Sequence, residues 1–353
     1  MSKELLNTLS DILHGEPVSS ASDEVLREAK KHSLSFLFPE GADPAMWKHV
    51  QFDYEYEALT AFLEQQGIWY LPMKGILLRE FYPQPWQRDF CDYDILVDPS
   101  KREPVVDWFT QRGYTHSECS NCDSFIKKPV LNFEIHNILF EPITPWFDAF
   151  SLEKLEKILK SDGCRRLLSD EDFYIYNILH WLKHFTGSGT GLRTLVDEYL
   201  FLRAKASTLD WSYIQDELER LPGSMGVMPL AFENRLRTVS QKVMDRKPLT
   251  EEELEFLLNF DEAGTYGNTE IRIRNDIRKT KNGSRLQYLI HRAFPPLSWY
   301  RELHPFLYRF RILIPFFCLY RLLTAVLTKA GRILREIGVV LRGGNKPSSE
   351  NRR

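Results

Sequence analysis

The segment Arg88-Asp-Phe-Cys-Asp92-Tyr-Asp94-Ile-Leu-Val97 is the most informative part of the sequence. Asp92 and Asp94 alternate with apolar residues, a period of two that is typical of a β-strand, so we expect both carboxylates on one face. Such a pair repels itself unless a cation neutralises it, and Mg²⁺ prefers oxygen ligands. The pattern therefore favours a metal site at the start of a buried strand. The alternative is a solvated acidic strand end.

A later strand, expected over residues 131–140, offers a third carboxylate. It contains Asn132-Phe-Glu134-Ile-His136, in which Glu134 and His136 share one face. If this strand pairs beside the first, Glu134 completes a cluster of three carboxylates, the kind that holds two metal ions. Taken alone, Glu134 would be an ordinary surface residue of an edge strand.

The surrounding pattern predicts an α+β chain. A helical N-terminus precedes a short strand at 68–71, a helical turn at 76–81 and a helix at 101–112 that ends at Gly113. Beyond about residue 145 the pattern is nearly all helical, and capping boxes open helices at Ser169 and Thr250. We expect N-terminal helices over 1–44, a small mixed sheet with flanking helices over 45–145, a helical domain completing the cleft over 146–340, and a disordered tail over 341–353.

Several motifs together resemble those of the uncharacterised nucleotidyltransferase family of bacteria, part of the DNA polymerase beta-like nucleotidyltransferase superfamily. The resemblance covers roughly residues 45 to 330. The motifs that carry it are Lys74-Gly75, Tyr82-Pro-Gln-Pro-Trp-Gln-Arg88, Asp92-Tyr-Asp94-Ile-Leu-Val, Glu134-Ile-His136, His180-Trp-Leu-Lys-His184-Phe, Gly191-Leu-Arg193 and Asp197.

The resemblance implies a transferase that moves a nucleoside monophosphate from an NTP such as ATP to a hydroxyl-bearing acceptor. It implies two Mg²⁺ ions, with Asp92, Asp94 and Glu134 as the metal-binding and catalytic carboxylates. Lys74 and Gly75 fall where the superfamily usually has Gly-Ser, whose backbone and hydroxyl hold the triphosphate.

Two basic side chains are candidates to hold the triphosphate in this chain. Lys74 would act as a point charge, and the guanidinium of Arg88 suits bidentate phosphate contacts. The alternative for Arg88 is an ion pair with Asp89 or Asp92.

The helical motif places His180 and His184 four residues apart on one helix face. We favour a structural role, with both histidines hydrogen-bonded to Asp197 or Arg193, over a zinc site, because no acid completes a zinc signature. A salt bridge between Arg193 and Asp197 is a further possibility. The functional alternative is that His184, Arg193 and His136 contact the nucleotide or the acceptor.

Composition and charge limit the partners. The 353 residues carry a net charge of −3, but residues 270–353 hold 18 Lys and Arg against 5 Asp and Glu. The surplus of acidic residues in the rest of the chain argues against an extended binding surface for nucleic acid. We therefore expect a small-molecule or protein acceptor. Five scattered cysteines and a start without signal-peptide features favour the cytoplasm.

Two rival functions remain open from the sequence. The same fold could bind nucleotide without transferring it, a possibility raised by Lys74-Gly75. Alternatively, the apolar and basic segment 306–340 could make the chain a peripheral membrane or assembly protein. We favour a helix packed on the catalytic domain for that segment, with its basic face lining the cleft or facing solvent.

Overall fold

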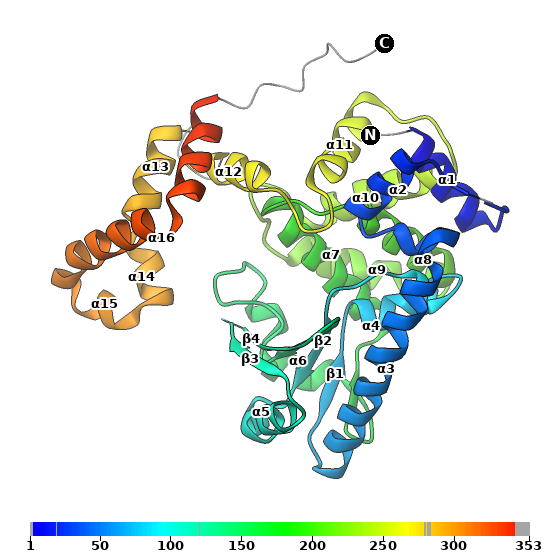
Figure 1. Cartoon of the computed structure of the whole chain (residues 1–353), viewed down its shortest axis with the longest axis horizontal. Helices are drawn as coiled ribbons and strands as arrows, with labels where there is room; N and C mark the ends of the chain where they lie inside the picture. The colour runs from blue at the N-terminus through cyan, green and yellow to red at the C-terminus, as the bar shows by residue number, and fades with distance from the viewer. Residues whose placement is uncertain (1–2, 19, 120, 279, 281–283, 343–353) are drawn as a thin grey trace. The chain divides into compact units, whose positions relative to one another are not determined.

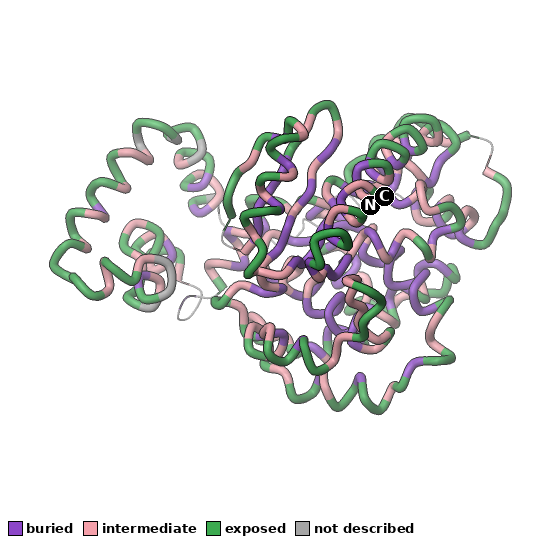
Figure 2. The backbone as a smooth tube through the Cα atoms, turned by 90° about the horizontal axis from the view of Figure 1, so that it is seen from below, coloured by how far each residue is buried: buried purple, intermediate pink, exposed green. Residues whose placement is uncertain are grey.

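The structure is a computed structural model that describes residues 3–342, except 19, 120, 279 and 281–283. The chain falls into two compact units. The first comprises the residues up to 183 together with 190–265, and the second comprises 184–189 together with the residues from 266 onward. Figure 2 shows that buried backbone is concentrated in the first unit.

The centre of the first unit is a mixed seven-stranded sheet with the order β3-β4-β5-β2-β1-β7-β6. Strand β2 pairs parallel with β5 and antiparallel with β1, so the acidic strand lies in the interior of the sheet. The strands are β1 (Tyr70–Pro72), β2 (Tyr93–Val97), β3 (Thr115–Glu118), β4 (Cys122–Lys127), β5 (Leu131–His136), β6 (Lys160–Asp162) and β7 (Arg165–Leu167).

One face of this sheet is a hydrophobic core. Tyr93, Ile95 and Val97 of β2 point into it, together with Phe133 and Ile135 of β5. Helices α3 (Ala42–Gln65) and α5 (Arg102–Gln111) cover this face and contribute aromatic and aliphatic side chains to the core (Figure 1). Because side chains alternate along a strand, the intervening residues of β2 and β5 face the other way. The same alternation that builds the core therefore places Asp94 and Glu134 on the opposite face.

The rest of the first unit is helical. Helices α8 and α10 pack together, and α1 joins them, with the Ser10 hydroxyl donating to the carbonyl of Met244 at 2.6 Å. The remaining helices of this unit are α1 (Lys3–His14), α2 (Asp23–Lys31), α4 (Gly75–Leu78), α6 (Leu152–Ile158), α7 (Asp170–Thr186, whose end belongs to the second unit), α8 (Arg193–Lys205), α9 (Trp211–Arg220), α10 (Pro229–Met244) and α11 (Glu251–Ala263).

The second unit is built from helices with a small core of its own. Ile273, Tyr288 and Val340 form that core, bringing together three helices. Its helices are α12 (Thr269–Arg278), α13 (Arg285–Ala293), α14 (Leu297–Leu303), α15 (Pro305–Arg309) and α16 (Ile314–Arg342). Among the described residues, the structure holds no helix with the length and apolar character needed to cross a membrane.

The predicted α+β class is confirmed, with a mixed sheet, flanking helices and a helical C-terminal region. The capping box of Thr250 and Glu253 forms as expected. The chain beyond residue 145 is mainly helical, as expected, but two short strands that were not expected, β6 and β7, extend the sheet there. The first unit includes the segment predicted as the catalytic core and much of the predicted helical domain. Residues 343–353 of the predicted tail lie outside the described residues.

Candidate active site

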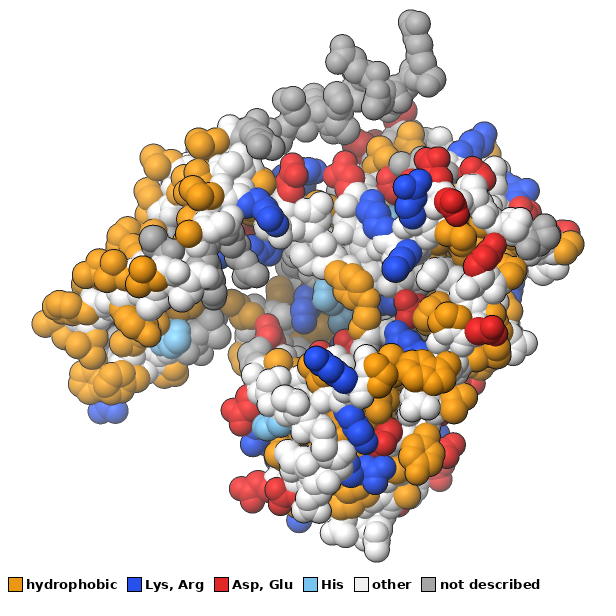
Figure 3. Space-filling view, viewed as in Figure 1, with side chains coloured by type: hydrophobic (Ala, Val, Ile, Leu, Met, Phe, Trp, Pro, Cys, Tyr) orange, Lys and Arg blue, Asp and Glu red, His pale blue; other side chains and the backbone are white. Residues whose placement is uncertain are grey.

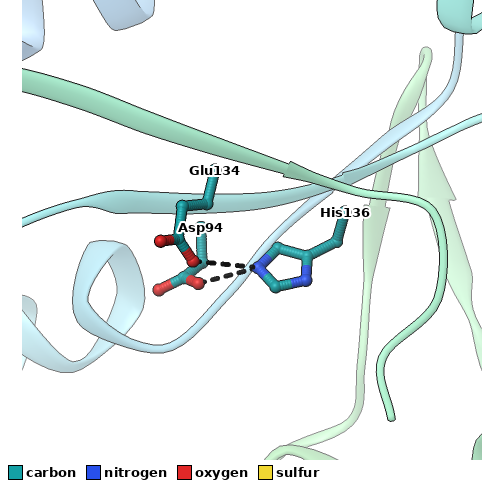
Figure 4. Close-up of side chains that lie close together, drawn as sticks. All are labelled: Asp94, Glu134 and His136. Carbon is teal, nitrogen blue, oxygen red and sulfur yellow. Dashed lines mark hydrogen bonds and ion pairs between the residues drawn. The ribbon is translucent and has the colours of Figure 1, made fainter. Parts of the chain in front are cut away.

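Asp94 and Glu134 are register partners on the parallel strands β2 and β5. The side chain of His136 joins them, and the ligand atoms of all three residues lie within 4.8 Å of one another. Figure 4 shows both carboxylates directed toward the imidazole, whose Nε2 lies 2.8 Å from Asp94 Oδ1 and 3.8 Å from Glu134 Oε2. The sequence-based condition for a shared cluster, that the two strands are neighbours, is therefore met.

Asp92 lies immediately before β2 rather than on it. Its side chain is half-buried, and its charge interacts with those of Asp94 and Glu134. The three predicted carboxylates thus share one electrostatic environment, although the tight group in Figure 4 contains His136 in place of Asp92.

Lys74 is held against this cluster by an unusual backbone conformation. It precedes α4 with φ of 48°, in the left-handed region that costs a non-glycine residue about 1–3 kcal/mol. The strand before it is fixed, because Met73 N–H donates to the Asp94 carbonyl at 3.1 Å. The Lys74 ammonium lies 2.6 Å from Asp94 Oδ1, so the strained turn places a half-buried positive charge at the site.

The charges in this cluster shift one another strongly. Burial and the neighbouring Asp94 raise the pKa of Asp92 to about 6. Burial and the two aspartates raise the pKa of Glu134 to about 7. Burial opposes ionisation of Asp94 as well, but Lys74 and His136 hold the pKa of its carboxyl well below the usual value. In this cluster the negative charge of Asp94 is therefore balanced by Lys74. The charges of Asp92 and Glu134 are not fully balanced by the nearby cations.

His136 orients Asp94 in this arrangement. Its Nδ1 accepts from the Asn121 amide at 3.3 Å, which leaves the proton on Nε2 to be donated to Asp94. Burial lowers the pKa of His136, so the ring is neutral near pH 7. The sequence interpretation made His136 a nucleotide contact, whereas its hydrogen bonds assign it to positioning a carboxylate.

Arg88 has a different environment from the one expected. Its Nε and Nη2 each donate to Asp197 at 2.8 Å, and the Tyr82 hydroxyl donates to the same carboxylate at 2.8 Å. All three groups are buried. The guanidinium is thus paired with Asp197 instead of with Asp89 or Asp92, and the expected triphosphate role stays a prediction. We assign this network to joining the sheet to α8.

The packing of Arg88 explains why a glycine is present at position 75. A Cβ atom at this position would lie 2.5 Å from Arg88 Nη1. Glycine therefore allows the guanidinium to approach the turn that follows Lys74. Gly75 therefore has a packing role, and the phosphate contact implied by the resemblance stays a prediction.

The helical motif also differs from its predicted arrangement. Asp197 bonds to Arg88 and Tyr82 instead of to His180, His184 or Arg193. Arg193 Nη1 donates to the Asp89 carbonyl at 2.7 Å, and its charge offsets part of the rise that burial and Asp94 cause in the pKa of Asp92. His184 belongs to the part of α7 assigned to the second unit.

Two functional candidates on α7 were missed by the sequence analysis. Lys183 is half-buried, and its charge interacts with Lys74, Asp94 and Glu134. Burial and Lys74 lower the pKa of Lys183, while burial raises the pKa of Tyr176 to about 12 beside Lys74 and Asp94. Their spacing in the sequence could have identified them, because residues 176, 180 and 183 lie on one face of a helix.

The residues present fit a divalent cation. Asp92 and Glu134 have raised pKa values because they repel Asp94 in a buried site, and added positive charge would relieve that repulsion. Their oxygens are the ligand type that Mg²⁺ prefers. Asp92, Asp94 and Glu134 would hold such an ion, with His136 as an orienting neighbour.

The fold and site together define an α+β protein with a lysine-flanked acidic cluster on one face of a mixed sheet. The chain belongs to the uncharacterised nucleotidyltransferase family, whose model matches residues 45–224. The matched segment contains the three carboxylates, Lys74 and Lys183. Comparisons with curated proteins and with solved structures give no match.

Proposed function

We propose that this protein transfers a nucleoside monophosphate from an NTP to a hydroxyl-bearing acceptor, with Mg²⁺ held by Asp92, Asp94 and Glu134. The observation that carries the proposal is the register pairing of Asp94 with Glu134, which places a buried and a half-buried carboxylate near Lys74. Membership of the nucleotidyltransferase family supports the reaction class. The nucleotide, the ions and the acceptor belong to the proposal.

The reaction forms a bond between the acceptor oxygen and the α-phosphorus and breaks the bond to the pyrophosphate leaving group. Bound Mg²⁺ would activate the acceptor hydroxyl and stabilise the charge on the leaving group. Glu134 is the more accessible carboxylate, with a side chain 29% exposed against 7% for Asp94. Its accessibility makes Glu134 the carboxylate that is better placed to accept the acceptor's proton.

The lysines supply positive charge for the triphosphate. Lys74 keeps Asp94 ionised and in place, and Lys183 adds a second cation on the α7 side of the cluster. Arg88 has no part in this step because its Nε and Nη2 are held by Asp197. For the acceptor, we propose a small-molecule or protein hydroxyl, since residues 1–269 carry a surplus of acidic groups that would repel a long nucleic acid.

One observation favours a second candidate function. The 2.6 Å ion pair between Lys74 and Asp94 neutralises a carboxylate without any metal. In a protein that binds nucleotide and does not transfer it, Lys74 could balance the charge of Asp94 at all times in place of a metal ion. In that case the raised pKa values of Asp92 and Glu134 would mark an incomplete site.

Parallel incubations with α-labelled and γ-labelled NTPs separate the two candidates. We expect Mg²⁺-dependent appearance of α-label on an acceptor, with γ-label released as pyrophosphate. Adding a small-molecule fraction or a protein fraction of a cell extract in separate reactions identifies the acceptor class. Mg²⁺-dependent NTP binding without pyrophosphate release in any reaction would support the non-catalytic alternative and reject transfer.

A further inference from the structure

The second unit exposes far more apolar surface than its small core buries. Seventeen large hydrophobic side chains between residues 286 and 341 are exposed among the described residues. Ile312 and Leu327 are 80% and 84% exposed. Figure 3 shows hydrophobic side chains spread over the outer surface of these helices. A concentration of exposed apolar side chains on a few neighbouring helices marks an interaction site.

The same helices are strongly basic. Residues 285–342 contain ten Lys and Arg but only two Asp and Glu. Of the two acidic residues, Glu336 is buried and accepts from Arg292 Nε at 2.8 Å. Arg301, Arg309 and Arg311 are exposed beside the apolar side chains. The surface is therefore both apolar and cationic.

An apolar cavity of about 420 Å³ lies between α13 and α16. Leu289, Leu322 and Ile337 contribute to its wall, as does Arg321. Arg321 stacks over Trp299, and its Nη1 is buried without a hydrogen-bond partner among the described residues. A phosphate oxygen would satisfy this nitrogen, and an acyl chain suits the apolar wall.

We propose that α13–α16 bind the surface of a membrane rich in anionic phospholipid. Leu327, Ile312 and Phe316 enter the boundary between headgroups and acyl chains, and the flanking arginines face lipid phosphates. The proposal goes beyond the nucleotidyl-transfer site and does not depend on it.

Charge favours a lipid surface over a second copy of this chain. A two-fold interface pairs a surface with itself, which would bring two arginine-rich faces together. The exposed apolar side chains also extend beyond α16 to α13, to α15 and to the turn at Ile312, so one helix-to-helix seam would leave most of them uncovered. An anionic bilayer neutralises the arginines and accepts apolar side chains from several helices at once.

Vesicle flotation with the full-length chain tests the proposal. We expect flotation with vesicles that contain phosphatidylglycerol, much less with pure phosphatidylcholine, and weakening as NaCl rises from about 0.1 M to about 0.5 M. Leu327→Glu and Phe316→Glu should each lower the bound fraction about tenfold, because a charge replaces a membrane-inserted side chain. Both side chains are exposed, so folding should be unaffected, as circular dichroism would check.

Tyr54→Glu is the matched control, since Tyr54 is as exposed as Phe316, at 69%, but lies on α3 in the first unit. It should float like the wild type. Equal flotation of all variants, or no flotation of the wild type, would overturn the proposal. So would sedimentation showing a lipid-independent dimer that Leu327→Glu converts to a monomer, since the surface would then join two copies.

Discussion

Asp94 on β2 lies directly opposite Glu134 on the parallel strand β5, and His136 two residues further along β5 hydrogen-bonds to Asp94. The backbone ladder of the sheet thus fixes the distance between two carboxylates. Building catalytic groups on strands holds them more precisely than loops do. Holding these carboxylates close together and partly out of water disfavours their ionised forms. The pKa values of Glu134 and Asp92 are raised for this reason.

The first prediction contrasts two isosteric substitutions in the cluster. Asp94→Asn removes the counter-charge of Lys74 and should lower the free energy of unfolding by about 3 kcal/mol. Glu134→Gln removes a repelled carboxylate and should leave stability unchanged or raise it at pH 8. Urea unfolding of both variants measures the difference. Equal stability of the two would contradict the assigned charge pattern.

The second prediction concerns the buried pair of Arg88 and Asp197. Arg88→Met leaves Asp197 without its main partner and should cost about 3–5 kcal/mol of stability. Adding Asp197→Leu should recover a large part of that loss, because no unpaired charge then remains. A double-mutant cycle by denaturant unfolding measures the coupling. If Arg88→Met instead kept full stability and lost only NTP affinity, the phosphate role expected from the sequence would be restored.

The third prediction tests the packing role of Gly75. Gly75→Ala places a methyl group against Arg88 Nη1 and should destabilise the protein by about 1–3 kcal/mol. Gly331→Ala is the control, because a Cβ there meets nothing within 4 Å and alanine favours a helix. The penalty at Gly75 should shrink in the Arg88→Met background. A penalty that stays the same in that background would assign the clash to another neighbour.

The fourth prediction is a pH dependence that arises away from the site. Tyr174 lies 2.7 Å from Glu198 and 2.9 Å from Glu233, and its one hydroxyl proton cannot serve both carboxylates. Glu198 therefore carries a proton, and burial raises the pKa of its carboxyl to about 8. Since this pKa lies above that of the unfolded chain, the stabilisation is complete below about pH 4.5 and is lost as pH rises through 8.

Glu198→Gln should flatten that dependence, because the amide donates to Tyr174 at every pH. Its melting temperature should exceed that of the wild type at pH 9 and differ little at pH 5. Glu233→Gln is the comparison, since it removes the ion pair with Arg237 at 2.8 Å but keeps Glu198, so the fall in stability as pH rises through 8 should remain. Parallel pH profiles for wild type and Glu198→Gln would show that Glu198 is ionised in the folded state.

Local patterns in the sequence predicted which sheet face the candidate site residues occupy. The alternation of polar and apolar residues correctly predicted that Asp94 and Glu134 lie on the sheet face opposite the core, because their neighbours Ile95 and Phe133 point into the core. The strands β3, β6 and β7 were missed, since Thr115-His-Ser-Glu, Lys160-Ser-Asp and Arg165-Arg-Leu lack an apolar alternation. Their strand conformation comes from pairing with neighbours rather than from their own composition.

Partners distant in sequence could not be predicted in this way. Arg88 and Asp197 are 109 residues apart, and nothing near either residue identifies the other. Short-range candidates such as Asp89 were therefore preferred. Lys183 was quoted within a motif but not assigned a role, because its proximity to Glu134 depends on how α7 packs on the sheet.

The most direct test of the central claim is Mg²⁺-dependent pyrophosphate release from NTPs in the presence of the acceptor fraction, compared across three proteins. Asp123→Asn is the matched control, since Asp123 is a buried strand aspartate held by Arg102 and His116. The account predicts release by wild type and Asp123→Asn, none by Asp94→Asn, and none by Glu134→Gln despite retained NTP binding. Undiminished release by Asp94→Asn or Glu134→Gln would contradict the assignment of this cluster as the catalytic site.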